Sequence, residues 1–147
     1  SLDTNDDPDD QWEGGLQDVL RYVDVFLPNA REAQRITKTG DLEAAVSQLA
    51  KLVPLVVIKQ GEQGAMAQRG PERFRSSPVK VDFVDPVGAG DSFDAGFLSQ
   101  YVRGADLPAC LAAGNMAGAF STTKPGGTEA FRDCKKQDAF WNRTSVK

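Results

Sequence analysis

The chain has 147 residues, of which 40% are hydrophobic and 26% charged, a balance typical of soluble globular domains rather than of disordered or membrane-spanning chains. Its formal net charge of -4, without a basic stripe, argues against nucleic acid as the principal partner, although backbone N–H groups can still bind a phosphate-bearing small molecule. Histidine is absent, which excludes Ser–His–Asp catalysis, Cys–His catalysis and His-ligated metals within this chain. Any general base must therefore be a carboxylate, lysine, tyrosine or cysteine.

The N-terminal sequence, the length of the apolar runs and the cysteines indicate where in the cell the protein is located. The N-terminus is acidic and polar and shows no apolar signal segment, and the central apolar run 55–58 is too short to span a bilayer. Cys110 and Cys134 lack CxxC spacing, which argues against zinc and fits a reducing compartment. We therefore expect a cytoplasmic protein without a membrane partner. The chain starts at Ser1 rather than Met, as a processed or excised product would.

Hydrophobic periodicity places the elements of the first half. It predicts, in chain order, a strand end at 1–5, a helix at 11–22, a strand at 24–27, a short helix capped by Asn29, a helix at 41–53 and a buried strand at 55–59.

The second half begins with a predicted hairpin around Gly70-Pro71. The pattern predicts hairpin strands at 65–69 and 72–76, a strand at 79–84, helices at 91–103 and 106–123, and a last helix around Phe140 and Trp141. Strands that alternate with helices indicate an α/β domain with a mostly parallel sheet, whose ligands bind at the carboxyl ends of strands. The loops after strands 24–27, 55–59 and 79–84 are therefore candidate sites.

The loop after 79–84 contains Gly88-Ala89-Gly90-Asp91 at the start of a helix. Glycines let a backbone approach a ligand closely, and the first N–H groups of a helix are unpaired at the positive end of its dipole. The loop is therefore either an anion hole with a carboxylate base beside it or a capped helix start. Taken alone, this short pattern favours the capped turn.

The loop after 24–27 contains Asn29 and Glu32, which lie three residues apart on one helix face. The pair fits a capping box, and it also fits a site that orients water around Mg²⁺. The capping box alone is the simpler interpretation.

The loop after 55–59 reads Lys59-Gln60-Gly61-Glu62-Gln63-Gly64. Such a glycine-spaced turn either receives a nucleotide or simply connects a hairpin, and it is not a Walker loop. Asn115 lies further on among alanines and glycines, which favour close helix packing or the close approach of a flat ligand.

The order of these loops resembles the ribokinase-like, or PfkB, family of carbohydrate kinases. The resemblance is carried by "DVFLPNAREA", "VVIKQGEQGA" and "DPVGAGDSFDAGF", with support from "LDTN" and "KPGGTEAF", and spans Ser1 to about Phe131. It implies a three-layer αβα sandwich with a mostly parallel sheet, in which the ATP site lies in the C-terminal half.

The resemblance also assigns roles to residues. Asp91 would be the general base for a sugar hydroxyl, and Gly88, Ala89 and Gly90 would offer N–H groups to the γ-phosphate. The resemblance places the nucleotide and its Mg²⁺ near Asn29 and Glu32 (through water), Lys59, Gly61, Glu62, Gly64 and, at the adenine, Asn115. Phosphoryl transfer needs mainly positioning and charge neutralisation, so these groups suffice without histidine.

Many family members also bind a monovalent cation such as K⁺. The matching positions are Asp85 and the carbonyls of Val87, Ser121, Lys124 and Gly126. Val87 replaces the usual threonine, which leaves its backbone carbonyl in place.

One departure concerns length, because family members are about twice as long. The resemblance implies that residues 1–147 are the C-terminal nucleotide-binding and catalytic portion, without the N-terminal sugar-binding half and lid. We expect ATP-dependent phosphorylation of a sugar, as in fructokinase or 2-keto-3-deoxygluconate kinase. The alternatives are a nucleoside kinase, a non-catalytic ATP-binding module and an inert fragment. An incomplete sandwich would leave sheet surface uncovered, which favours a homo-oligomer.

Overall fold

A computed structural model describes residues 1–4, 7, 9, 11, 12 and 14–144 of the chain. The fold consists of two compact units. The first comprises Ser1–Gly61 and Ala65–Arg75, and the second comprises Glu62–Gly64 and Ser76–Lys147. Within the described residues, no helix has the length and apolar character needed to cross a membrane.

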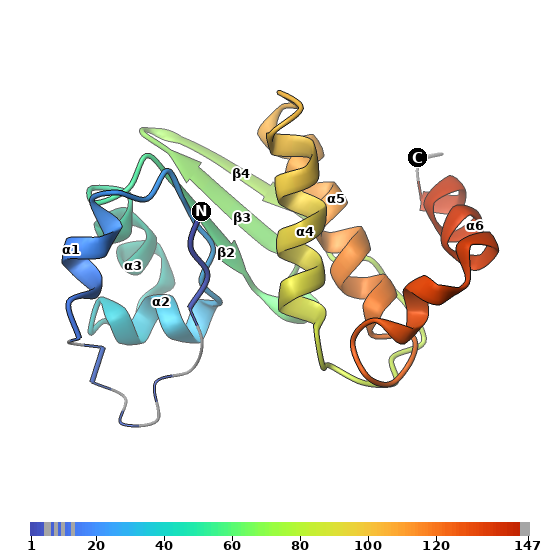
Figure 1. Cartoon of the computed structure of the whole chain (residues 1–147). Coiled ribbons are helices and arrows are strands. Elements are labelled where there is room, and N and C mark those ends of the chain that lie inside the picture. Colours follow the sequence, from blue (N-terminus) through green and yellow to red (C-terminus); the bar gives the residue numbers. More distant parts are fainter. Residues whose placement is uncertain (5–6, 8, 10, 13, 145–147) are drawn as a thin grey trace. The chain divides into compact units, whose positions relative to one another are not determined.

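A four-stranded sheet runs in the order β1 (Val25–Phe26), β2 (Leu55–Lys59), β3 (Ala65–Arg69) and β4 (Glu72–Ser76) (Figure 1). β1 and β2 are parallel because helices connect them, whereas β2 and β3 are antiparallel because only five residues, Gln60, the short η1 (Gly61–Gln63) and Gly64, separate them. The predicted strands at 24–27, 55–59, 65–69 and 72–76 are confirmed. The α/β class is also confirmed, with a sheet that is parallel only in part.

The chain start extends this sheet. Leu2 forms a parallel bridge to Phe26, with its N–H donating to Val25 O and its carbonyl accepting from Leu27 N–H, each at 2.9 Å. The predicted strand end at 1–5 is thus confirmed at Leu2, and Asn5 lies outside the described residues.

Three helices cover one face of the sheet (Figure 1): α1 (Leu16–Leu20), α2 (Ala30–Ile36) and α3 (Leu42–Leu49). Their apolar sides and alternate strand residues form the core, which includes Leu20, Phe26, Ile36, Val46, Leu49, Val56, Ile58 and Met66. The prediction of a helix over 11–22 was too long. Gly15, with φ 83°, precedes the first helical residue, and Trp12 has φ 55°, so the described residues before Leu16 form no helix.

In the second unit, α4 (Ala89–Tyr101) and α5 (Leu107–Ser121) lie side by side (Figure 1). Small residues allow this approach: a Cβ atom at Gly96 would lie 2.6 Å from Ala113 O. Phe93 packs directly on Gly114, where an added Cβ would meet its ring at 2.8 Å. The small residues around Asn115 therefore serve helix packing.

The C-terminal part adds η2 (Glu129–Arg132) and α6 (Cys134–Thr144), which confirms the predicted last helix. Phe120 of α5 is the centre of an aromatic cluster, with ring centroids 5.0–5.4 Å from those of Phe131, Phe140 and Trp141.

The strand predicted at 79–84 is wrong. This segment has no strand in the described structure, and Phe83 and Val84 are exposed. At the end of the segment, the backbone N–H groups of Val84 and Asp85 both donate to the same carbonyl oxygen, Thr122 O. The alternating pattern suits a strand, but a strand also requires a neighbour with a matching ladder of hydrogen bonds.

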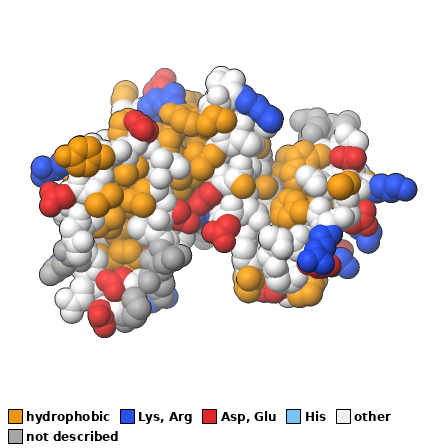
Figure 2. All heavy atoms as spheres, in the orientation of Figure 1, with side chains coloured by type: hydrophobic (Ala, Val, Ile, Leu, Met, Phe, Trp, Pro, Cys, Tyr) orange, Lys and Arg blue, Asp and Glu red, His pale blue; other side chains and the backbone are white. Residues whose placement is uncertain are grey.

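Several other large hydrophobic side chains are exposed, most of all Tyr22 and Val102, and Figure 2 shows hydrophobic side chains reaching the surface of the face that it presents.

Candidate functional site

Polar side chains gather at the carboxyl ends of three parallel segments in the first unit. Asp3 and Thr4 follow the bridge at Leu2, Asn29 and Glu32 follow β1, and Lys59 ends β2. Asn29 itself forms a parallel bridge with Lys59. This edge is where ligands of α/β sheets bind.

Asn29 and Glu32 form a complete capping box at the start of α2. Asn29 Oδ1 accepts the Glu32 N–H at 2.9 Å, and Glu32 Oε2 accepts the Asn29 N–H at 2.8 Å. Asn29 Nδ2 donates to Glu32 Oε1 at 2.6 Å, and Thr4 Oγ1 donates to Glu32 Oε2 at 3.1 Å. Burial raises the pKa of the Glu32 carboxyl, and the hydrogen bonds from Asn29 and Thr4 partly oppose this rise. The cap orients both side chains.

Lys59 carries a positive charge into this cluster. The Lys59 Nζ lies 2.8 Å from Asp3 Oδ1, and the backbone N–H of Lys59 donates to Pro28 O at 3.1 Å. The sequence analysis left Asp3 and Thr4 out of the site, although both lie in the strand end predicted at 1–5. That position was the signal that would have included them.

The loop before α4 is tied to a distant turn by Asp85. Asp85 Oδ1 accepts the Val87 N–H at 3.0 Å, and Oδ2 accepts the Gly126 N–H at 2.8 Å. These two hydrogen bonds lower the pKa of the Asp85 carboxyl. Gly88 and Gly127 are in backbone contact, since a Cβ at Gly88 would lie 2.7 Å from Gly127 Cα.

The first turn of α4 presents N–H groups next to a carboxylate. Gly88 is the N-cap, with φ 74°, and the Ala89 N–H donates to Pro86 O at 3.1 Å. The N–H groups of Gly90 and Asp91 make no hydrogen bond to the described part of the chain. The Asp91 side chain is exposed in the same turn. This donor set fits an anion, with a carboxylate beside it.

Gly64 and Asn115 meet at the segment Ser76–Pro78. Asn115 Nδ2 donates to Ser76 O at 3.2 Å and to Ser77 O at 3.0 Å. A Cβ at Gly64 would lie 2.1 Å from Ser76 O and 2.9 Å from Pro78 N. Two residues predicted to face the nucleotide, from separate elements, thus share one segment.

Comparison with known proteins places this arrangement in a family. The model of the pfkB family carbohydrate kinases matches residues 3–134. The chain belongs to the pfkB family of carbohydrate kinases.

The similarity of this pfkB chain extends to curated proteins and solved structures. An uncharacterized sugar kinase of Archaeoglobus fulgidus is 32% identical over 116 residues, which cover 79% of this chain and 46% of that protein. The cytidine kinase of Thermococcus kodakarensis is 39% identical over 102 residues, which cover 67% of this chain and 37% of that protein. A putative ribokinase II from E. coli, solved in complex with ATP and Mg²⁺, has a TM-score of 0.85 and 27% identity, with 97% of this chain and 48% of that chain covered. The match confirms the ribokinase-like fold, and the chain spans about half the length of these relatives or less.

In this pfkB chain, the structure brings together several predicted residues within each unit. Asn29, Glu32 and Lys59 form one group, Asp85 reaches Val87 and Gly126, and Gly64 shares its segment with Asn115. Gly61 and Glu62 lie in η1, Ser121 is buried with its hydroxyl donating to Gly118 O, and Lys124 is exposed. Among the described residues, no group of three or more Cys, Asp or Glu is placed to hold a metal ion directly.

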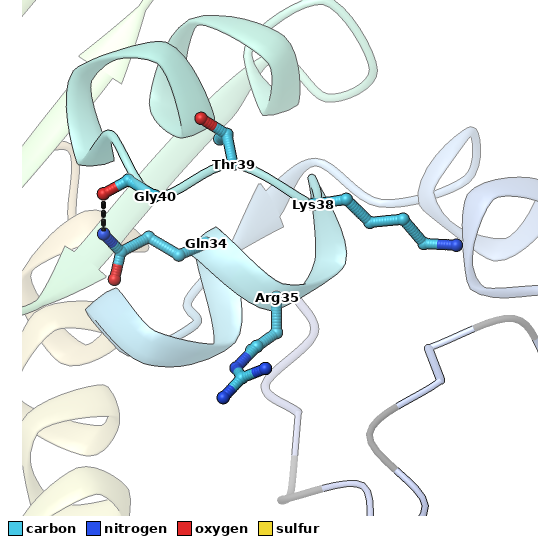
Figure 3. A pocket seen from close by; sticks show the side chains of 5 residues that line it. All are labelled: Gln34, Arg35, Lys38, Thr39 and Gly40. Carbon is cyan, nitrogen blue, oxygen red and sulfur yellow. Dashed lines mark hydrogen bonds between the residues drawn. The ribbon is translucent and has the colours of Figure 1, made fainter.

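A surface hollow of about 490 Å³ lies at the end of α2 opposite to Asn29. It is lined by Gln34, Arg35, Lys38, Thr39 and Gly40. The side chains of Arg35 and Lys38 point away from each other, and Gln34 Nε2 donates to Gly40 O at 2.6 Å (Figure 3). The polar groups do not converge, so we do not assign a ligand to this hollow.

Proposed function

We propose that this chain supplies the nucleotide-binding and catalytic portion of a kinase that transfers the γ-phosphoryl group of ATP to a sugar hydroxyl. The observation that carries the proposal is the first turn of α4. The N–H groups of Gly90 and Asp91 point to no partner in the described chain, and the Asp91 carboxylate is exposed beside them. An anion hole and a base in one helical turn are the two groups that phosphoryl transfer to a hydroxyl requires.

In this proposal, the Asp91 carboxylate accepts the proton of the attacking hydroxyl. The N–H groups of the Gly88–Asp91 turn stabilise the negative charge of the transferred group. The Ala89 N–H contributes least, because it already donates to Pro86 O. Bound ATP would supply the phosphoryl group, and Mg²⁺, held near Asn29 and Glu32, would neutralise charge on the phosphate oxygens.

The resemblance to the family assigns the remaining predicted residues to the same nucleotide. Asn29 and Glu32 would hold Mg²⁺ through water, since the capping box already uses part of their hydrogen-bonding capacity. Lys59, Gly61, Glu62 and Gly64 would line the phosphates and ribose. K⁺ would bind at Asp85, where carboxylate lone pairs remain beyond the two N–H donors, with the carbonyls of Val87, Ser121, Lys124 and Gly126.

The proposed acceptor of the phosphoryl group is a sugar hydroxyl. Relatives include a sugar kinase and a cytidine kinase, so a nucleoside is a second candidate acceptor with equal support. We infer that the sugar-binding half and the lid lie outside these residues, because the relatives are more than twice as long as the matched segment. The exposed Phe83, Val84 and Val87 are suited to contact that half or a second copy.

A coupled ADP-release assay with ATP·Mg²⁺ and a panel of sugars and nucleosides tests the proposal. The full-length protein that includes this chain should release ADP with at least one acceptor, and Asp91→Ala in that protein should lower kcat by about 10²–10⁴-fold, the usual contribution of a positioned base. Asp18→Ala, at an exposed position of α1, is the matched control. An Asp91→Ala variant with the control's kcat would contradict the base assignment. ATP binding without turnover of any acceptor would favour the non-catalytic module.

A further inference from the structure

Asn115 is a buried amide that uses both of its N–H groups within the chain. It lies in α5 with 8% of its surface exposed, and its Nδ2 donates to the carbonyls of Ser76 and Ser77. Any direct contact with a ligand is therefore limited to Oδ1. The main role of the Asn115 side chain is to hold the backbone carbonyls of residues 76 and 77.

A second contact on this segment comes from Gly64. Its backbone, with φ 86°, leaves no space for a side chain, because a Cβ would lie 2.1 Å from Ser76 O. Gly64 ends the loop that begins at Lys59, and Pro78 has no N–H with which to anchor the segment itself. Ser76–Pro78 is thus fixed by Asn115 through hydrogen bonds and by Gly64 through van der Waals contact.

We propose that Asn115 is a positioning residue, which locks Ser76–Pro78 onto Gly64 and thereby shapes the part of the site that receives the nucleoside moiety of ATP. This inference rests on the proposed function. Without the two donors, the carbonyls of Ser76 and Ser77 lose their partner, the segment moves off Gly64, and the nucleoside side of the site loses its form. The phosphate side, built on the first turn of α4, is unaffected.

The test compares Asn115→Asp with the wild type. The carboxylate has nearly the same shape, but it donates nothing and repels both carbonyls. Asn142→Asp, at an exposed position of α6, is the matched control. Calorimetry measures the affinity for ATP·Mg²⁺ and for tripolyphosphate·Mg²⁺, which lacks the nucleoside. We expect Asn115→Asp to weaken ATP binding about tenfold, the effect of losing one to two hydrogen bonds, with unchanged tripolyphosphate affinity. Unchanged ATP affinity, or equal losses for both ligands, would overturn the proposal.

Two further measurements test whether Asn115 and Gly64 hold the segment Ser76–Pro78, which we call the lock, separately from the question of whether ATP binds. Trypsin cleavage after Lys80, two residues beyond Pro78, should be faster in Asn115→Asp than in Asn142→Asp, whether or not ATP is present. Gly64→Ala should reproduce the loss of ATP affinity, and the double variant should lose little more, because both changes act on one segment. Equal cleavage rates would overturn the lock. A wild-type chain that binds neither ligand, with the predicted cleavage difference, would instead overturn the proposed function and leave the lock purely structural.

Discussion

The carboxylate of Asp85 accepts a 2.8 Å hydrogen bond from the N–H of Gly126, 41 residues further along the chain. Its other oxygen accepts the N–H of Val87 at 3.0 Å. One side chain thus joins the loop that precedes α4 to the turn that follows α5. The turn at Gly88–Asp91, which we propose to bind an anion, owes its shape to this connection as well as to its own glycines.

Replacing Asp85 should change how stability depends on pH. Its folded pKa lies below the ordinary carboxyl value, so its contribution is present above that ordinary value and is lost as the pH falls through the lowered pKa. Asp85→Asn should therefore lower the urea midpoint at neutral pH and flatten its decline in acid. Urea unfolding from about pH 7 to about pH 2 measures this, with Asp18→Asn as the control. Parallel pH profiles for Asp85→Asn and the wild type would contradict the assignment.

Gly88→Ala tests the contact between Gly88 and Gly127. The new Cβ would lie 2.7 Å from Gly127 Cα at a positive φ, and we expect a loss of about 1–3 kcal/mol in the free energy of unfolding. Gly104 is a matched control, because it has φ 80° and no atom within 4 Å of an added Cβ. Gly104→Ala isolates the cost of the backbone conformation, about 1 kcal/mol. Equal losses in the two variants would show that the Gly88–Gly127 contact is looser than the structure indicates.

Gly96→Ala tests the approach of α4 to α5 through the sign of its effect. In an open helix position this change stabilises by about 0.5–1 kcal/mol. Here the Cβ would lie 2.6 Å from Ala113 O and 2.8 Å from Ala117 Cβ, so we expect a loss of about 1–3 kcal/mol. Chemical denaturation measures the difference, and a more stable variant would refute the close packing.

Arg73 and Arg75 both pair with Glu43, but their environments differ. Arg73 also donates to Ser47 Oγ at 2.7 Å and to Gln68 Oε1 at 2.8 Å, whereas the Arg75 side chain is 62% exposed. Arg73→Ala should therefore cost about 1 kcal/mol more than Arg75→Ala, which should be nearly neutral. Unfolding midpoints at low and high salt measure the difference, and equal costs would show that the extra hydrogen bonds contribute nothing.

The sequence predicts elements best where local signals and tertiary context agree. The strands at 65–69 and 72–76 have the predicted bounds, because the Gly70-Pro71 turn sets the hairpin locally. The helix at 11–22 is too long in the prediction, since Gly14 and Gly15 outweigh the apolar periodicity around them. The strand at 79–84 fails for another reason, because its alternation is real but no neighbouring strand pairs with it in the described chain.

The candidate site likewise contains some contacts that local sequence signals predict and others that depend on tertiary packing. Asn29 and Glu32 are predictable from local spacing, because a capping box needs only residues three apart. The contacts of Asp85 with Gly126 and of Asn115 with Ser76 are not predictable from spacing, because each depends on how α4 and α5 pack. Asp3 and Thr4 join the site through strand pairing at Leu2, which periodicity over so few residues cannot define.

The most direct measurement is a calorimetric titration of the chain with ATP·Mg²⁺. The wild type should bind one equivalent saturably with a dissociation constant of about 1 mM or below, and Gly88→Ala should bind about tenfold more weakly than Gly104→Ala. The absence of binding heat at millimolar ATP, or equal affinity in the two variants, would contradict the assignment of the Gly88–Asp91 turn as the nucleotide's anion hole.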